Sequence, residues 1–328
     1  MIIFSFPAII MNIGADIAGM GAAAHLLTPA IPSYVFSILF TCILMVVIIY
    51  YPYRKVAAIL KWACITLLMY LVVPFFTEVN WKDVARSTFI PHLEWSEDYI
   101  SMLVAILGTT ISPYLFFWQA TMEAEETKMK GSPIMVDKRM INTMREDVIS
   151  GMFFSNLVMF FVILTCGSVL HAHGVQKIDT VEQAASALRP IAGNAAYGLF
   201  SLGIVGTGFL AIPVLSGSLS YMMAETFGWE EGLDRKFNEA RPFYGVIVVS
   251  LVVGLVINYI GITPIQGLIY TAILYGITAP ILIPIILHIS NNRKIMGDKV
   301  NKLRTNILGW IAFALMAAAA IVLLWQLL

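Results

Sequence analysis

Apolar runs of about 20 residues alternate with short polar segments along the whole chain, and runs of that length can cross a lipid bilayer as helices. The pattern predicts nine such spans, approximately at residues 1–27, 34–51, 56–76, 99–122, 147–170, 195–223, 243–260, 264–288 and 306–327. We therefore expect an all-α polytopic membrane protein in which residues 1–328 form a single transmembrane domain, with no soluble domain.

Lys and Arg are distributed unevenly between the segments that connect the spans. When these segments are assigned alternately to the two sides, sixteen of the 20 basic residues share one side, within residues 54–61, 128–145, 235–241 and 293–304. The other side holds only Lys82, Arg86, Lys177 and Arg189. Because basic residues accumulate in cytoplasmic loops, the N-terminus is expected in the cytoplasm and the C-terminus outside the cell membrane.

Composition agrees with this class and excludes others. Hydrophobic residues make up 59% of the 328 and charged residues only 12%, whereas a soluble domain carries about 25% charged residues. The net charge is zero and the basic residues are dispersed among loops, so no nucleic-acid partner is expected. The chain contains no Ser-His-Asp order, P-loop or HExxH motif, which argues against an enzyme and against a bound cofactor.

Several residues that attract attention have a structural explanation. Cys42, Cys64 and Cys166 lie inside apolar runs without disulfide or CxxC spacing, so they are expected to be small buried hydrophobes. Glycines in the first and sixth spans predict close helix packing. His171 and His173 form an HxH pattern at the end of the fifth span, where a hydrated loop is favoured over a metal site.

A polar interruption lies halfway along the fourth span, in Gly108-Thr-Thr-Ile-Ser112-Pro113-Tyr114. Pro113 cannot donate a backbone hydrogen bond, so nearby carbonyls lose their helical partners inside the bilayer. Unwound carbonyls at the end of a half-helix can form a cation site, to which Thr110 and Gln119 can add oxygen ligands. The alternative is a plain proline kink whose carbonyls are satisfied by Ser or Thr hydroxyls.

Asp16 is the one carboxylate in the interior of a span, within Gly14-Ala-Asp16-Ile-Ala-Gly19. An ionisable group at that depth costs about 3 kcal/mol, so Asp16 is a candidate for an ion or proton path. The alternative is a structural carboxylate near the cytoplasmic end of the helix, where it is hydrated or paired with a hydroxyl.

The run GTTISPYLFFWQATMEAEE resembles the sixth helix of the Nramp superfamily of divalent metal transporters, in the form found in Nramp-related magnesium transporters. The flanking spans resemble that family from its third to its eleventh helix. The resemblance implies a leucine-transporter-like fold of the APC superfamily, with inverted repeats and alternating access. It implies Mg²⁺, Mn²⁺ or Fe²⁺ as substrate and metal ligands among Thr109, Thr110, Ser112, Tyr114, Gln119 and Thr278.

The chain differs from the manganese and iron transporters of that family at the metal site. Their sixth-helix motif is Met-Pro-His, and Ser112-Pro113-Tyr114 stands in its place. Loss of a thioether sulfur removes a soft ligand, and a serine hydroxyl suits a hard ion. Mg²⁺ keeps several waters at its sites, so small oxygen groups with room for a hydrated ion favour magnesium.

Proton coupling is predicted to be absent. In proton-coupled relatives the third helix carries Asp and then, three residues later, Glu, and a sixth-helix His assists. Asp16 matches that Asp, but Gly19 replaces the Glu and Tyr114 replaces the His. We therefore expect gradient-driven passage of the metal ion.

The family's first two helices, including an Asp-Pro-Gly-Asn type motif, have no counterpart before Met1. We therefore expect an N-terminally truncated chain that lacks half of the metal site. Two alternatives to a transporter of metal ions remain open at this point: a transport-inactive fragment or scaffold, and an amino acid carrier of the same fold. The expected partners are the metal ion and the lipid bilayer, and the sequence indicates no oligomeric state.

Overall fold

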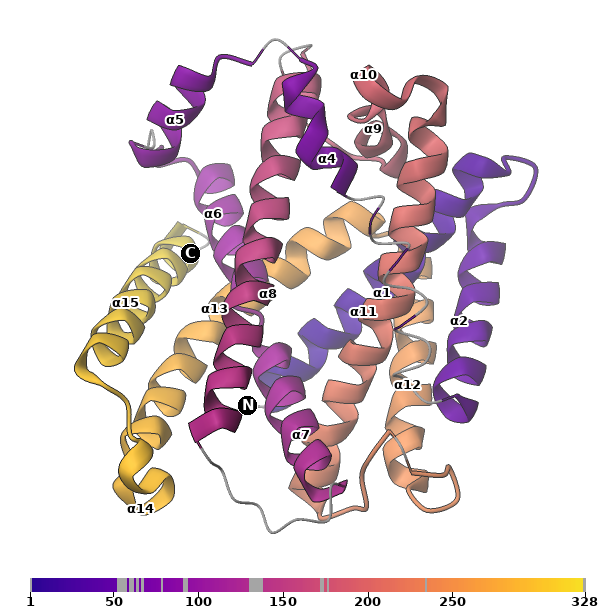
Figure 1. The fold of residues 1–328 in the computed structure, drawn as a ribbon. Helices are drawn as coiled ribbons and strands as arrows, with labels where there is room; N and C mark the ends of the chain where they lie inside the picture. The colour runs from indigo at the N-terminus through magenta and orange to yellow at the C-terminus, as the bar shows by residue number, and fades with distance from the viewer. Residues whose placement is uncertain are drawn as a thin grey trace.

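The computed structural model describes residues 2–51, 58, 62, 65, 68–77, 79–90, 94–129, 138–171, 174–175, 177–233 and 235–326. All regular elements in this part of the chain are helical (Figure 1), which confirms the all-α prediction. The short helices are α4 (Met69–Val72), α5 (Trp81–Phe89), α9 (Val181–Ser186), α10 (Arg189–Ala192) and α14 (Arg293–Met296). The long helices are α1 (Ile2–Leu27), α2 (Ser33–Tyr50), α6 (Glu97–Thr110), α7 (Pro113–Met129), α8 (Lys138–Thr165), α11 (Ala196–Phe227), α12 (Arg241–Ile257), α13 (Pro264–Asn291) and α15 (Leu303–Gln326).

Among the described residues, eight helical stretches are long and apolar enough to cross a membrane, with α6 and α7 forming one of them. They overlap eight of the nine ranges expected from the sequence. In the remaining range, 56–76, residues 56, 57, 59–61, 63, 64, 66 and 67 lie outside the described residues, and the described part contains α4 and the 3-10 turn Val73–Phe75. Helix α8 begins nine residues earlier than its apolar run, because the polar stretch from Lys138 to Asp147 continues the helix beyond the hydrophobic part.

Helix α1 lies in the interior of the bundle, where it packs against α2, α11, α12 and α13. Ile9, Ile13, Ile17 and Met20 on α1 are completely buried. A Cβ added to Gly14 would lie 2.7 Å from the carbonyl oxygen of Gly254, so the backbones of α1 and α12 touch at this point. Glycine at this crossing therefore allows the close helix packing expected from the sequence.

Helices α8 and α15 lie at the periphery and expose large apolar side chains, among them Phe153, Phe154 and Leu315. Such surfaces are typical of helices that face lipid. Cys42 lies on the outward face of α2 and is exposed, so the expectation that it is buried is wrong; the lipid-facing side of a helix accepts a small apolar residue equally well. Cys166 is half-buried, and Cys64 lies outside the described residues.

The connections that follow α11 and α13 lie at the lower end of the bundle in Figure 1, whereas α5, α10 and the turn between α1 and α2 lie at the upper end. Arg241, Arg293 and Lys294 are therefore at the lower end, and Lys82, Arg86 and Arg189 at the upper end. This separation has the pattern on which the orientation is predicted, with the lower end in the cytoplasm.

Candidate cation site

The fourth predicted span is broken between α6 and α7, at Ile111 and Ser112. Ile111 has φ −118° and ψ 62°, outside the helical region, and its N–H donates to the Leu107 carbonyl at 3.0 Å. Pro113 then opens α7, since it has no N–H to donate back to the Thr109 carbonyl. The break therefore lies where the Thr-Thr-Ile-Ser-Pro sequence predicts it.

Hydroxyl groups next to the break donate to the carbonyls that surround it. Ser112 Oγ donates to the carbonyl oxygens of Thr109 at 3.0 Å and of Gly108 at 3.2 Å. Thr110 Oγ1 donates to the carbonyl of Ile106 at 2.8 Å. These bonds satisfy backbone groups as the kink alternative requires, while each hydroxyl oxygen keeps lone pairs that can still bind a cation.

Glycines bring α13 against the end of α6. A Cβ on Gly108 would overlap the carbonyl oxygen of Ala272 and the backbone nitrogen of Gly276, and a Cβ on Gly276 would overlap the Val104 carbonyl. Only residues without a side chain allow two backbones to approach this closely. Ile111 packs against a buried cluster that includes Ala279 and Ile283, so the middle of α13 lies beside the break.

Four polar side chains from three helices lie near one another in the interior next to the break: Asn12 and Asp16 on α1, Tyr114 on α7 and Tyr275 on α13. We call them the Asp16 cluster. The rings of Tyr114 and Tyr275 are 5.7 Å apart, and the half-buried Asp16 lies close enough to interact electrostatically with both phenols. The Tyr275 hydroxyl makes no hydrogen bond of good geometry with the described residues, although the Asn12 side chain lies beside it. The cluster offers a carboxylate, an amide and two phenols to a ligand.

Helix α7 is fixed at this position by its contacts with α11. The Trp118 ring packs onto Gly217, where an added Cβ would lie 2.6 Å from it, and its centroid is 6.1 Å from that of Tyr221. One turn further on, Thr121 Oγ1 donates to Glu225 Oε1 at 3.2 Å. The half-helix that begins at the break is therefore held on α11, with Tyr114 turned toward α13.

The sequence-predicted residues fall into two groups. Asp16 and Tyr114 meet in the cluster, and Ser112 is buried two residues before Tyr114. Thr278 is buried one turn after Tyr275 and donates to the Leu274 carbonyl at 2.7 Å.

The side chains of Thr109 and Gln119 are exposed, so the structure does not bring them to the Asp16 cluster. Thr110 is half-buried, with its hydroxyl 3.9 Å from the thioether sulfur of Met159. His171 of the HxH pattern is exposed, and His173 lies outside the described residues.

Sequence reasoning missed Asn12, Thr271 and Tyr275. Thr271 is 1% exposed, and its hydroxyl has no hydrogen-bond partner among the described residues. The signal was the spacing: Asn12 and Asp16 are four residues apart, as are Thr271 and Tyr275, which places each pair on one helix face.

No group of three or more His, Cys, Asp or Glu side chains comes together in the described part of the chain. A cation in this region therefore depends on one carboxylate supplemented by neutral oxygens from hydroxyl, phenol, amide and carbonyl groups. Such a ligand set suits hard ions, because these prefer oxygen and soft ions prefer sulfur.

A bundle of membrane-length helices, one of them broken beside an interior polar cluster, is the architecture of a membrane transporter. The comparison with known proteins is more specific: the chain belongs to the Natural resistance-associated macrophage protein-like (Nramp) family, whose profile matches residues 1–326. This confirms the resemblance to the Nramp superfamily.

Three curated relatives named "Divalent metal cation transporter MntH" are similar to the chain. The protein from Clostridium acetobutylicum is 23% identical over 78% of this chain and 56% of its own length. Those from Caldanaerobacter subterraneus subsp. tengcongensis and Yersinia enterocolitica are each 24% identical, over 72% and 73% of this chain and 52% and 54% of their own lengths. The chain therefore spans about half the length of the curated relatives it matches, and these relatives are named as transporters and not as enzymes.

Proposed function

We propose that the chain takes part in carrying divalent metal cations across the cell membrane, and that the break and the Asp16 cluster supply ligands to the transported ion. The observation that supports this most directly is the meeting of Asp16, Tyr114 and Tyr275 next to the unwound residues Ile111 and Ser112. A carboxylate at membrane depth is costly unless a partner compensates it, and a cation is such a partner. Membership of the Nramp family and the names of the MntH relatives agree with this cargo.

The oxygen ligands favour a hard ion, which leads us to propose Mg²⁺ or Mn²⁺ as the substrate. Ser112 stands at the end of the break with a hydroxyl and no sulfur. Met159 places a thioether 3.9 Å from the Thr110 hydroxyl, which offers sulfur to a softer ion such as Fe²⁺ on that side of the break. The proposal includes transport by alternating access, since half-helices that end at a break can tilt independently of each other.

The proposal extends to uncoupled passage of the metal ion. Asp16 is the single carboxylate of the cluster, while Gly19 lies one turn further on and meets nothing within 4 Å of an added Cβ. A second carboxylate that could release a proton as the metal binds is therefore not part of this cluster.

The test is metal binding by the purified chain, measured by calorimetry with Mn²⁺ and with Mg²⁺. Asp16→Asn keeps the shape and removes the charge, and we expect at least tenfold weaker binding, which corresponds to about 1.4 kcal/mol. Ser112→Ala tests the break. Its matched control is Ser216→Ala, because Ser216 is also a buried hydroxyl that donates to a carbonyl one turn earlier, Ile212 at 2.8 Å.

Unchanged Mn²⁺ and Mg²⁺ affinity in Asp16→Asn, with the variant folded, would rule out the cluster as a cation site. If the unaltered chain binds neither ion, the result favours a transport-inactive fragment or scaffold. If it binds an amino acid instead, the result favours an amino acid carrier of the same fold. Equal effects of Ser112→Ala and Ser216→Ala would assign the Ser112 hydroxyl to the kink alone.

A further inference from the structure

The turn between α13 and α15 carries an excess of positive charge at the lower end of the bundle. Residues 293–304 contain five basic side chains and one acidic one, Asp298. The five basic side chains are all exposed: Arg293, Lys294, Lys299, Lys302 and Arg304. Arg293, Lys294, Lys302 and Arg304 form no ion pair with the residues that the structure describes.

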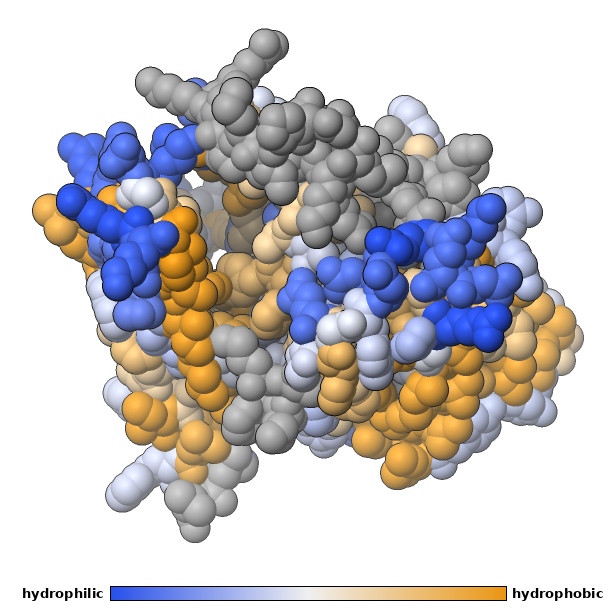
Figure 2. All heavy atoms as spheres, turned by 90° about the horizontal axis from the view of Figure 1, so that it is seen from below, coloured by the Kyte–Doolittle hydropathy of each residue, from blue (hydrophilic) through white to orange (hydrophobic). Residues whose placement is uncertain are grey.

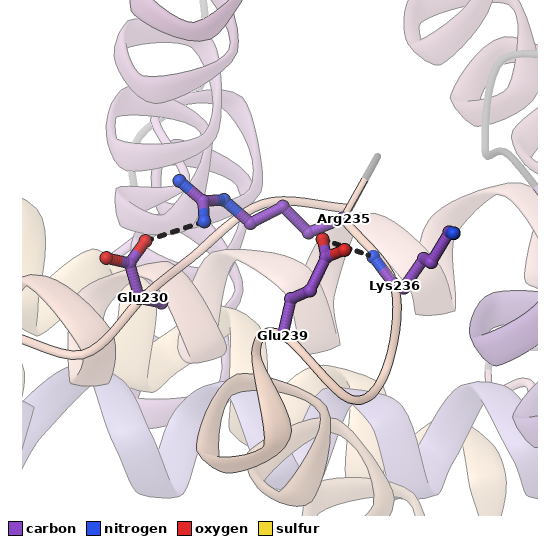
Figure 3. Close-up of polar contacts among 4 residues, drawn as sticks. All are labelled: Glu230, Arg235, Lys236 and Glu239. Atoms are coloured by element: carbon purple, nitrogen blue, oxygen red, sulfur yellow. Dashed lines mark hydrogen bonds and ion pairs between the residues drawn. The ribbon is translucent and has the colours of Figure 1, made fainter.

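The other described basic loop at this end contains an ion pair of its own. Between α11 and α12, Arg235 pairs with Glu230 at 2.7 Å, and Glu239 accepts a hydrogen bond from the backbone N–H of Lys236 at 3.2 Å (Figure 3). The Tyr244 hydroxyl also donates to the Arg235 carbonyl at 2.7 Å and fixes the loop. The two loops lie on the same side, so their difference in charge pairing is not an effect of orientation alone.

The basic turn is built as a fixed surface. Asn291 and Asn306 exchange side-chain hydrogen bonds of 2.9 and 2.7 Å across the ends of α13 and α15, and Asn301 Nδ2 donates to Asn306 Oδ1 at 3.1 Å. Gly297 has φ +57°, a conformation that favours glycine and lets the chain reverse after α14. The positive side chains are therefore displayed from a closed turn.

Apolar side chains lie among these charges. Ile295 is 62% exposed, Leu303 75% and Leu308 68%. Seen from below, Figure 2 shows the hydrophilic group over α14 next to apolar surface, apart from the hydrophilic group over the α11–α12 loop. Side chains that combine a basic head with adjoining apolar area fit the boundary between lipid head groups and acyl chains.

We propose that this turn, Arg293 to Arg304 with Leu308, is a binding site for the head group of an anionic phospholipid. The phosphate pairs with Arg293, Lys294 and Lys302, while the acyl chains lie along the exposed apolar side chains Ile295, Leu303 and Leu308. Clusters of basic residues directly beside a transmembrane helix attract anionic lipid in this way, and the exposed apolar surface distinguishes a lipid from a free phosphate. The proposal does not depend on the transported ion.

Trp310 provides a local probe, because it is half exposed on α15 and lies seven residues, roughly 10 Å, after Leu303. The full chain is reconstituted in phosphatidylcholine vesicles that contain brominated phosphatidylglycerol or brominated phosphatidylcholine. Bromine quenches nearby tryptophan, and subtraction of the signal of a Trp310→Phe variant isolates Trp310. The ratio of the two quenching constants gives the preference for the anionic lipid at this turn.

We expect a preference of about fivefold or more in the unaltered chain, since one basic side chain near an anionic surface contributes roughly that factor. In Arg293→Gln/Lys294→Gln/Lys302→Gln the preference should fall to about one. The matched control Arg235→Gln/Lys236→Gln/Arg241→Gln removes the same charge from the same side and should leave the Trp310 preference unchanged. Arg293→Lys, which keeps the charge, should also keep it.

Equal quenching by the two lipids in the unaltered chain would overturn the proposal, as would equal loss in the two triple variants. Displacement of the brominated phosphatidylglycerol by millimolar inorganic phosphate would show that the turn takes a free anion instead. Circular dichroism of each variant establishes that the helices are intact, and the altered side chains are all exposed.

Discussion

The contact between Gly108 and Gly276 fixes α13 against the break, so we predict that a substitution at Gly108 destabilises the chain. Gly108→Ala adds a single methyl group. Its carbon would overlap the Ala272 carbonyl oxygen and the Gly276 backbone nitrogen and would lie 2.9 Å from the Gly276 Cα. Backbone atoms cannot rotate away as a side chain can, so the two helices must move apart by about 1 Å or more to bring the tightest of these contacts, to the Ala272 carbonyl oxygen, to an ordinary distance.

The expected loss of stability in Gly108→Ala is the difference between two opposing effects. Overpacking of this kind costs about 1–3 kcal/mol, and the upper half of that range applies where both sides are backbone. Replacing a helical glycine by alanine returns about 0.5–1 kcal/mol. The net loss is therefore about 1–2 kcal/mol of stability, and the Tyr114–Tyr275 contact beside it is disturbed as well.

The assay is thermal unfolding of the purified chain in detergent, combined with Mn²⁺ calorimetry. We expect the apparent unfolding temperature of Gly108→Ala to fall by about 2–8 °C and its Mn²⁺ affinity to fall with it. Gly19→Ala is the matched control, since an added Cβ there meets nothing within 4 Å, and it should unfold at the original temperature or slightly above. Equal stability and equal Mn²⁺ affinity of the two variants would show that the contact between α6 and α13 at Gly108 tolerates an added methyl group.

The remaining predictions concern the Asp16 cluster, the loop between α11 and α12, and the coupling of transport. Ser112→Met introduces a thioether and should strengthen Mn²⁺ or Cd²⁺ binding relative to Mg²⁺; an unchanged preference counts against Ser112 as a ligand. Tyr275→Phe removes a buried hydroxyl and should weaken Mn²⁺ binding about three- to tenfold in calorimetry, roughly the value of one hydrogen bond. Tyr244→Phe removes the hydrogen bond to the Arg235 carbonyl, lowers stability by about 1 kcal/mol and should raise hydrogen exchange in residues 235–240. Unchanged protection of these residues would show that this bond does not fix the loop. Mg²⁺ uptake into proteoliposomes should be the same with and without an imposed pH gradient, and strict dependence on external acid would refute uncoupled passage.

The positions of the eight membrane-length helices in the described part of the chain were predictable because the length of each apolar run indicates them. The break was predictable from Pro113 together with the polar residues before it, because Pro113 denies the Thr109 carbonyl its helical partner; proline alone does not interrupt α11 at Pro213 or α13 at Pro280. The start of α8 was not, because its first residues are polar and are helical by continuation from the apolar part.

The composition of the cluster could be predicted only in part. Asp16 was found as a carboxylate inside an apolar span and Tyr114 through the resemblance to the Nramp family, but Tyr275 looks in the sequence like an ordinary aromatic in an apolar span. Its place depends on the crossing of α6 and α13 at Gly108 and Gly276, a contact between residues 168 positions apart. Thr109 and Gln119 show the converse: they are close in sequence to the break, yet the helix turns their side chains outward.

We propose that a divalent cation binds where the break meets the Asp16 cluster. The position of bound Mn²⁺ can be measured by its anomalous X-ray scattering in crystals of the full chain. We predict a peak between Ser112 and Asp16, at ligand distances of about 2.0–2.6 Å from oxygen atoms. The peak should disappear in Asp16→Asn. A peak only elsewhere, or one that persists unchanged in Asp16→Asn, would exclude a cation site at the break and the Asp16 cluster.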